Sequence, residues 1–284
     1  MADLPVTDIA TPAALKWIRL GIRAATAASP ALAARIAERL FMTPRQFAMP
    51  EREKAATATA TPFEVATGPK SVVRGWSWGE GPNVFLVHGW EGRGSQLSAF
   101  AAPLVAAGFR VLGWDAPGHG ASTGKRSSLV HFAWGVRQVA AAMGEPHAVI
   151  AHSLGCAATT LALFEGMHAN RVVFVAPPLQ PADYTERFGE LLGIKDSVIE
   201  RMKVRIEERF LRKWDDYSLA RMGRDMKTPL LVIHDRDDRD TFLWESEGLV
   251  AAWPDSRLVV TAGLGHRRIL REPSVLAMAT EFIS

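Results

Sequence analysis

The sequence has almost no cysteine, no long apolar run and no dense cluster of basic residues. Cys156 is the single cysteine among 284 residues, which excludes an intramolecular disulfide framework and a multi-cysteine zinc site. Because no run of about 18 apolar residues is present, we expect no membrane-spanning helix. The net charge of +3 comes from scattered Lys and Arg side chains, which argues against a nucleic-acid-binding surface.

The chain also lacks the features of an exported protein. Its first residues, Met-Ala-Asp-Leu-Pro-Val-Thr-Asp, show no basic segment followed by an apolar one, so we expect no signal peptide. With the single cysteine, this favours a cytoplasmic location. Apolar residues make up 48% of the chain and charged residues 22%, so it can form a substantial core.

The spacing of apolar residues predicts an N-terminal helical extension. They recur at helical intervals over residues 12–48, and Ser29-Pro30 indicates a break between two helices. Residues 49–62 contain Pro50 and a charged cluster, which are typical of a linker. We therefore expect an extension and linker over residues 1–62 and a second domain over residues 63–284.

The second domain has the pattern of an α/β protein. Two segments predict an antiparallel edge, and six apolar segments separated by helix-length intervals predict a mainly parallel sheet with helices on both faces. In chain order these strands lie near residues 63–67, 71–78, 84–87, 110–114, 148–151, 171–176, 230–233 and 257–260.

One interval between predicted strands is too long for a single crossover helix. It covers about residues 179–227, and we expect it to form a helical cap inserted over the C-terminal edge of the sheet. Its apolar residues would form the core of the cap or an acyl pocket; they include Ile194, Val198, Met202 and Phe210.

A serine between small residues ends the strand near residues 148–151. The run Ala151-His152-Ser153-Leu154-Gly155 permits a sharp strand-to-helix turn that exposes the serine hydroxyl, known as a nucleophile elbow. We expect the side chain of His152 to point away from the position of a catalytic base. Cys156 is expected to pack within the helix that follows.

The last two predicted strands are followed by a candidate base and its acid. His266 lies on a glycine-flanked loop, where an imidazole can reach the serine. Asp235, Asp237, Asp238 and Asp240 follow the preceding strand, and one of them would orient the imidazole. Asp238 is our first choice and Asp237 our second.

The run His88-Gly89-Trp90 indicates an oxyanion hole or, as the alternative, a glycine turn with a structural histidine. Gly89 allows the backbone to turn so that the N–H of Trp90 faces the space above Ser153, and Leu154 supplies a second N–H.

A further polar run, from Gly113 to Ser122, contains Asp115 and His119. We interpret it as a turn whose polar side chains hydrogen-bond to its own backbone, because Pro and Gly residues surround them.

Together these motifs resemble those of the α/β-hydrolase superfamily, in its serine esterase, lipase and serine-aminopeptidase-like branch. The matching runs lie within about residues 70–284: His88-Gly89-Trp90, Asp115 to Ser122, Ala151 to Gly155, His234 with Asp238, and Gly265-His266. Two features depart from the family pattern. Ala151 replaces the first glycine of the elbow, and the N-terminal extension is not part of the family core.

The resemblance implies an eight-stranded, mostly parallel sheet, and it implies that no cofactor takes part. It also implies a triad of Ser153 as nucleophile, His266 as base and Asp238 as acid. The N–H groups of Trp90 and Leu154 would then form the oxyanion hole. No metal ligands or substrate-binding residues can be named.

The sequence therefore predicts a serine hydrolase, with a small to medium carboxylic ester as the favoured substrate. A thioesterase or amidase with the same triad, and a non-catalytic binding protein with this fold, are the alternatives. We expect no nucleic-acid partner, and we expect the N-terminal helices to pack either against the hydrolase domain or against a second copy of the chain in a homodimer. A membrane-surface helix is the rival interpretation, since Lys16, Arg19 and Arg23 lie near Trp17.

Overall fold

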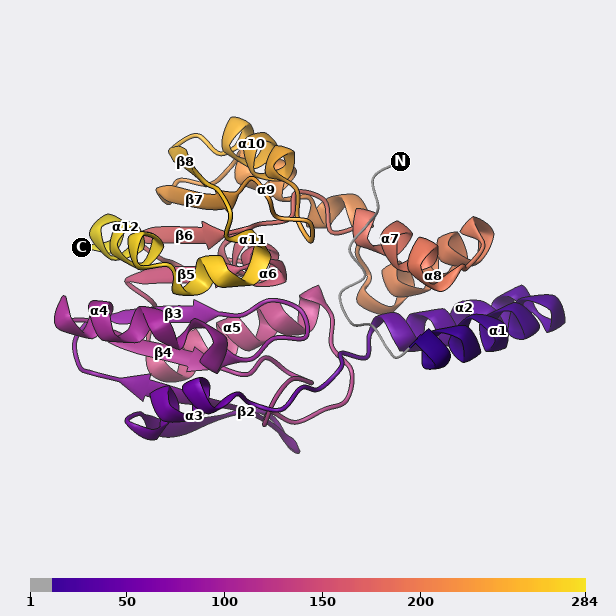
Figure 1. The fold of residues 1–284 in the computed structure, drawn as a ribbon, viewed down its shortest axis with the longest axis horizontal. Helices are drawn as coiled ribbons and strands as arrows, with labels where there is room; N and C mark the ends of the chain where they lie inside the picture. Colours follow the sequence, from indigo (N-terminus) through magenta and orange to yellow (C-terminus); the bar gives the residue numbers. More distant parts are fainter. Residues whose placement is uncertain (1–11) are drawn as a thin grey trace. The chain divides into compact units, whose positions relative to one another are not determined.

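The computed structural model describes residues 12–284, which divide into two units (Figure 1). The larger unit combines Pro44–Leu179 with Leu219–Ser284, and the smaller combines the chain up to Thr43 with Gln180–Ser218. The N-terminal helices thus share a unit with the segment predicted to be a cap, an arrangement that the sequence did not indicate.

The larger unit is built on an eight-stranded sheet with the order β1-β2-β4-β3-β5-β6-β7-β8. β1 pairs antiparallel with β2 and β2 with β4, whereas all other neighbours are parallel. The predicted antiparallel edge and parallel sheet are therefore confirmed. The strands are β1 (Thr61–Gly68), β2 (Ser71–Trp78), β3 (Asn83–Val87), β4 (Arg110–Trp114), β5 (Ala148–His152), β6 (Arg171–Val175), β7 (Leu230–Asp235) and β8 (Ser256–Thr261).

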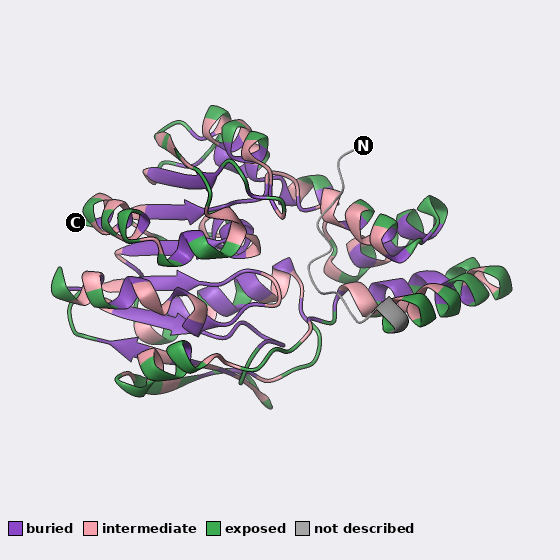
Figure 2. Ribbon diagram, viewed as in Figure 1, coloured by how far each residue is buried: buried purple, intermediate pink, exposed green. Residues whose placement is uncertain are grey.

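Helices cover both faces of this sheet because alternate strand residues form two apolar faces. On one face Leu86 and Ile150 share a buried core with Val275 and Ala279 of α12. The inner strands β3 to β7 are buried almost throughout, whereas the edge strands β1 and β8 are partly exposed (Figure 2). The helices of this unit are α3 (Glu51–Ala58), η1 (Gly94–Phe100), α4 (Ala101–Ala106), α5 (Leu129–Met143), α6 (Leu154–Phe164), α9 (Leu219–Gly223), α10 (Leu243–Ala252), α11 (Gly265–Arg268), η3 (Ile269–Arg271) and α12 (Pro273–Ile283).

The smaller unit is helical. It contains α1 (Pro12–Ala28), α2 (Pro30–Phe41), α7 (Asp183–Leu192), α8 (Asp196–Phe210) and η2 (Trp214–Tyr217). The predicted break is confirmed: Ser29 accepts a hydrogen bond from the N–H of Leu32, and Pro30 begins α2. The helical run ends at Phe41 rather than at residue 48, where the prediction placed its end.

A buried carboxylate joins the N-terminal helices to the insertion. Glu38 of α2 accepts hydrogen bonds from Nε of Arg205 at 2.7 Å and from Nε of Arg209 at 2.8 Å, both on α8. Arg19 of α1 donates to the carbonyl oxygen of Leu191. The sequence could not show these contacts, because the partners are more than about 160 residues apart and belong to no local pattern. Of the apolar residues named above for the insertion, Ile194, Val198 and Met202 are buried, as expected of a core.

The segment predicted to be a linker, residues 49–62, instead holds α3 and the start of β1. Alanine favours the helical state, and Glu51 and Glu53 lie in the first turn of α3, where the helix dipole favours negative charge. Glu53 is buried and accepts hydrogen bonds from Nε of Arg93 and Oγ of Ser95, each at 2.7 Å. This segment is therefore a packed part of the larger unit.

Within residues 12–284, no helix combines the length and the apolar character that crossing a membrane requires.

Candidate active site

Ser153 stands at a sharp turn between β5 and α6. Its backbone has φ 51° and ψ −124°, a left-handed conformation that a non-glycine residue adopts only when its surroundings enforce it. Gly155 helps to enforce this conformation of Ser153, because any Cβ at position 155 would lie 2.5 Å from the carbonyl oxygen of Val87. Only glycine lets α6 approach the end of β3 this closely. The strained strand-to-helix turn predicted from the sequence is thus present, and Ala151 is accommodated within β5.

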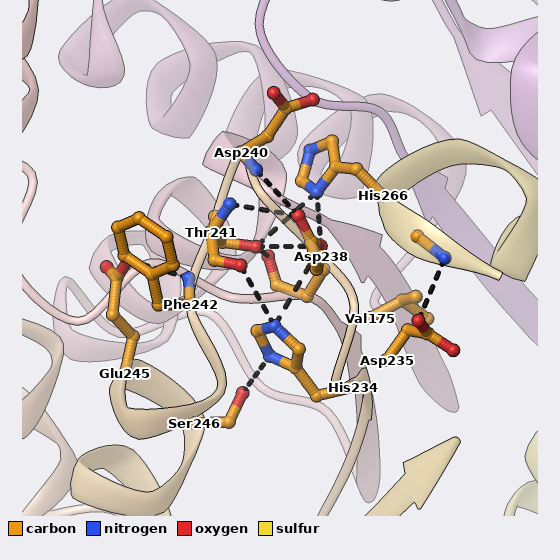
Figure 3. A network of polar contacts seen from close by, with 12 residues as sticks. Val175, His234, Asp235, Asp238, Asp240, Thr241, Phe242, Glu245, Ser246 and His266 are labelled. Atoms are coloured by element: carbon orange, nitrogen blue, oxygen red, sulfur yellow. Dashed lines mark hydrogen bonds and ion pairs between the residues drawn. The ribbon is translucent and has the colours of Figure 1, made fainter. Parts of the chain in front are cut away.

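His266 and Asp238 point toward each other (Figure 3). Nδ1 of His266 lies 2.7 Å from Oδ2 of Asp238, whose side chain is fully buried. The carboxylate also accepts hydrogen bonds from Oγ1 of Thr241 and from the backbone N–H groups of Asp240 and Thr241. Since the carboxylate accepts a hydrogen bond from Nδ1 of His266, Nδ1 carries the proton of the ring. Nε2 is then left as a proton acceptor.

Opposing effects act on the Asp238 carboxyl. Burial raises its pKa, but the hydrogen bond and the charge of His266, together with the N–H groups of Thr241 and Asp240, outweigh burial and lower the pKa. Asp238 is therefore ionised at neutral pH, as a residue that stabilises an imidazolium must be.

The neighbouring aspartates hold the loop that carries His266. Asp235 accepts from the N–H of Gly265 at 2.9 Å, the N–H of Leu264 at 3.1 Å and Oγ1 of Thr261 at 2.8 Å. Asp237 accepts from the N–H of Gly263 at 2.7 Å. Among the aspartates after β7, Asp238 is the one whose carboxylate contacts the His266 ring in the described structure.

We expect these carboxylates to make the stability of the protein sensitive to acid. Burial raises the pKa of Asp235, but its hydrogen-bond donors outweigh burial and lower it, as in Asp238. The stabilisation is present above the unfolded-state pKa of about 3.9 and is lost as pH falls through the lower folded values. Urea unfolding at pH 7 and at pH 3 should show a smaller acid-induced loss in Asp235→Asn than in wild type. An equal acid-induced loss of stability in both proteins would show that the Asp235 carboxylate does not contribute to the acid sensitivity.

Two residues that the sequence analysis did not place in the site hold the acid loop. The carbonyl oxygen of Thr241 lies 3.2 Å from Nε2 of His234, which must donate to it, and Nδ1 of His234 then accepts from Oγ of Ser246 at 2.6 Å. Burial lowers the pKa of His234, which keeps the ring neutral as this pattern requires. His234 was recognisable only as part of a motif, and Thr241 gave no signal in the sequence.

The turn at residues 89–92 lies beside the serine. A Cβ on Gly89 would come within 2.9 Å of Cβ of Ser153, so only a bare backbone fits there. The N–H of Gly92 donates to the carbonyl oxygen of Gly89 at 3.1 Å and closes the turn. Leu154 is the first residue of α6, so its N–H has no acceptor within the helix. The peptide groups predicted to form an oxyanion hole thus come from two segments that meet at Ser153.

Neutral histidines support this turn. His88 donates from Nδ1 to the carbonyl oxygen of Gly89 at 2.7 Å and accepts at Nε2 from the N–H of Ala116. Nε2 of His119 accepts from the N–H of Glu91 at 3.2 Å. Burial lowers the pKa of His88 to about 3 and that of His119 to about 4, so both rings can act as acceptors.

The structural interpretation of the run from Gly113 to Ser122 is confirmed. Asp115 accepts hydrogen bonds from the N–H of Gly94 at 2.9 Å and from that of Ala121 at 2.8 Å. Oγ of Ser122 donates to the backbone oxygen of Asp115. Asp115 therefore fixes a turn, as does His119.

The expectation that His152 points away from the base is wrong. Its ring centroid lies 4.4 Å from that of His266, and its Nε2 donates to the backbone oxygen of His266 at 2.9 Å. Burial lowers the pKa of His152 well below its usual value, so the ring is neutral. The cause of the error is tertiary: the loop that carries His266 passes against the end of β5, which no local pattern reveals.

No hydrogen bond joins Oγ of Ser153 to the His266 ring in the part of the chain that the structure describes. The elbow and the histidine–aspartate pair are linked through His152. Catalytic hydrogen bonds are often long in the absence of substrate and tighten when it binds.

Across residues 12–284, no three His, Cys, Asp or Glu side chains are grouped so that they could hold a metal ion.

Cys156 is buried within α6, and burial raises the pKa of its thiol well above the usual value, in keeping with the packing role predicted for it.

Known proteins resemble this chain in family and in fold. Residues 82–218 match the family described as "Serine aminopeptidase, S33". A comparison with curated proteins gives no match. An esterase from Pyrococcus furiosus is 19% identical, with 85% of this chain and 97% of that chain covered and a TM-score of 0.63.

Two further solved structures show how widely this fold is used. A serine hydrolase from Cycloclasticus zankles is 16% identical, with 78% and 97% of the chains covered and a TM-score of 0.61. A bromoperoxidase from Bacillus anthracis is 18% identical, with 78% and 99% covered and a TM-score of 0.61. At these identities the similarity concerns the fold alone. The sheet order and the elbow are those of the α/β-hydrolase fold, and within that fold residues 82–218 resemble the serine aminopeptidase family.

Proposed function

We propose that this chain is a serine hydrolase, specifically a carboxylesterase for small to medium acyl esters. Ser153 would be the nucleophile, His266 the base and Asp238 the acid. The observation that supports this most is the 2.7 Å hydrogen bond between His266 and the buried Asp238, which leaves Nε2 of His266 free to accept a proton. The similar proteins described as an esterase and a serine hydrolase support it further.

The reaction would proceed through an acyl-enzyme. Nε2 of His266 removes the proton from Oγ of Ser153 as that oxygen attacks the ester carbonyl carbon, and Asp238 stabilises the imidazolium. The N–H groups of Trp90 and Leu154 stabilise the oxyanion of the tetrahedral intermediate. His266 then gives its proton to the departing alkoxide. Water repeats the sequence on the acyl-enzyme, releases the carboxylic acid and restores Ser153.

A panel of acyl donors tests this proposal. Purified protein would be assayed with p-nitrophenyl esters from acetate to decanoate, matched thioesters and matched anilides. We expect hydrolysis of the shorter esters, with a burst of about one equivalent of nitrophenol if deacylation is the slower step. A strong preference for thioesters or anilides would replace the esterase with a thioesterase or an amidase. Folded protein that cleaves none of them would favour a non-catalytic binding protein.

The cytoplasmic location and the homodimer through the N-terminal helices stay predictions. Trp17 and Leu20 of α1 are exposed, and such a dimer would cover them.

A further inference from the structure

The turn beside Ser153 contains a residue in an unfavourable conformation. Glu91 has φ 56°, and it occupies the third position of the turn from Gly89 to Gly92. Glycine or asparagine is usual where a turn needs a positive φ, and any other side chain is strained in that conformation. Contacts elsewhere in the protein must therefore hold Glu91 in place.

Arg45 supplies those contacts. Its Nε lies 2.9 Å from both carboxylate oxygens of Glu91, its Nη2 donates to Oε2, and its backbone N–H donates to Oε1 at 3.1 Å. Both side chains are partly buried, with 31% of Arg45 and 19% of Glu91 exposed. A bidentate, partly buried pair of this kind restricts geometry far more than an exposed surface pair does. The N–H of Glu91 also donates to Nε2 of His119, so contacts hold both the backbone and the carboxylate of Glu91.

Arg45 belongs to a segment that is itself anchored to the larger unit. We call residues 45–53 the strap. Nε2 of Gln46 donates to the carbonyl oxygen of Gly118 at 3.0 Å, and Nη1 of Arg93 donates to that of Phe47 at 2.9 Å. Glu53, at the end of the strap, is buried against Arg93. The strap lies outside residues 82–218, which the family comparison matches.

We propose that Arg45 is a positioning residue for the oxyanion hole, which it acts on through Glu91. The φ of Glu91 and the conformation of Trp90 together define the turn, so relaxation of Glu91 to a negative φ would open it. The peptide N–H of Trp90 would then leave its place beside Ser153. The inference rests on the proposed function, since it gives the strap a role in stabilising the oxyanion of that reaction.

A double-mutant cycle tests the inference. Glycine adopts a positive φ without a side-chain cost, so the turn in Glu91→Gly needs no ion pair. Arg45→Ala should lower kcat for a p-nitrophenyl ester about tenfold or more, with little change in KM. Complete loss of one oxyanion-hole donor lowers kcat by about 10²–10³-fold, and a displaced donor loses part of that effect. In the Glu91→Gly background the same substitution should leave kcat within about twofold.

The control is Arg52→Ala, since Arg52 is an exposed strap residue whose 3.6 Å ion pair with Glu53 leaves Glu91 untouched. It should retain wild-type kcat. Wild-type kcat in Arg45→Ala would overturn the inference. An equally large loss from Arg45→Ala in the Glu91→Gly background would also overturn it, because Arg45 would then act by another route.

A second readout does not depend on ester hydrolysis. Hydrogen–deuterium exchange of peptides covering residues 88–93 reports the bonds made by the N–H groups of Glu91 and Gly92. We expect faster exchange there in Arg45→Ala than in Arg52→Ala. Equal exchange in the two variants would refute the inference even in an active enzyme. If no acyl donor is cleaved but exchange rises as expected, the proposed function fails while the coupling of the strap to the turn stands.

Discussion

Ser153→Ala is expected to lower kcat for ester hydrolysis by about 10⁴–10⁶-fold, because it removes the oxygen that forms the acyl-enzyme. The remaining groups would still bind and polarise the ester, so a small rate above the uncatalysed reaction should persist. The measurement is steady-state hydrolysis of the best p-nitrophenyl ester, with folding checked by circular dichroism. Activity within tenfold of wild type would show that Ser153 is not the nucleophile.

A matched variant separates chemistry from backbone strain at this position. Ser153→Gly also lacks the nucleophile, but glycine tolerates the φ of 51° that serine and alanine adopt there at a cost. We expect Ser153→Gly to be as inactive as Ser153→Ala and more stable toward urea, by roughly 1 kcal/mol. Equal stability of the two variants would mean that the elbow stores no strain.

Asp238→Asn is expected to lower kcat by about 10⁴-fold. An asparagine amide can donate to Nδ1 of His266, which would place the histidine proton on Nε2, the nitrogen that must accept from Ser153. Asp237→Asn is the matched control: its carboxylate binds the N–H of Gly263, so we expect a change of only a few-fold. The two variants would be compared in the same ester assay. A larger loss in Asp237→Asn would reverse the assignment of the acid.

The site is positioned by loops whose carboxylates and imidazoles have fixed ionisation states. Asp235 is held as a carboxylate by backbone donors and Thr261, and Asp238 by His266 and backbone donors, whereas burial keeps the rings of four histidines neutral: His88, His119, His152 and His234. Neutral rings can accept hydrogen bonds from backbone N–H groups, and ionised carboxylates can accept several. The carboxylates, His88 and His119 thus accept from peptide N–H groups of the turns, whereas His152 and His234 donate to peptide carbonyl oxygens.

The features that follow from local pattern could be predicted from the sequence. Six of the eight strands contain a short apolar run, and the small residues around Ser153 are what a strand-to-helix elbow requires. The order of Ser153, Asp238 and His266 along the chain was also visible. The turn role of Asp115 could be predicted because its Pro and Gly neighbours determine the backbone.

What depends on tertiary contacts could not be predicted. The ring of His152 packs against His266 because the loop that follows β8 passes against the end of β5, although two strands lie between β5 and β8 in the sheet. Glu38 pairs with Arg205 and Arg209 across more than about 160 residues, so the sequence did not show that the N-terminal helices and the insertion share a unit. The choice between Asp237 and Asp238 depended on loop geometry, since both occupy the same short polar run.

The most direct test of the central claim, an activated serine at the elbow, is covalent labelling. Purified protein would react with a fluorophosphonate probe, and the modified residue would be mapped by mass spectrometry in wild type, Ser153→Ala and His266→Ala. We predict a single adduct on Ser153 that is absent in Ser153→Ala and forms far more slowly in His266→Ala. Folded wild-type protein that takes up no probe, or takes it up at another residue, would contradict the account.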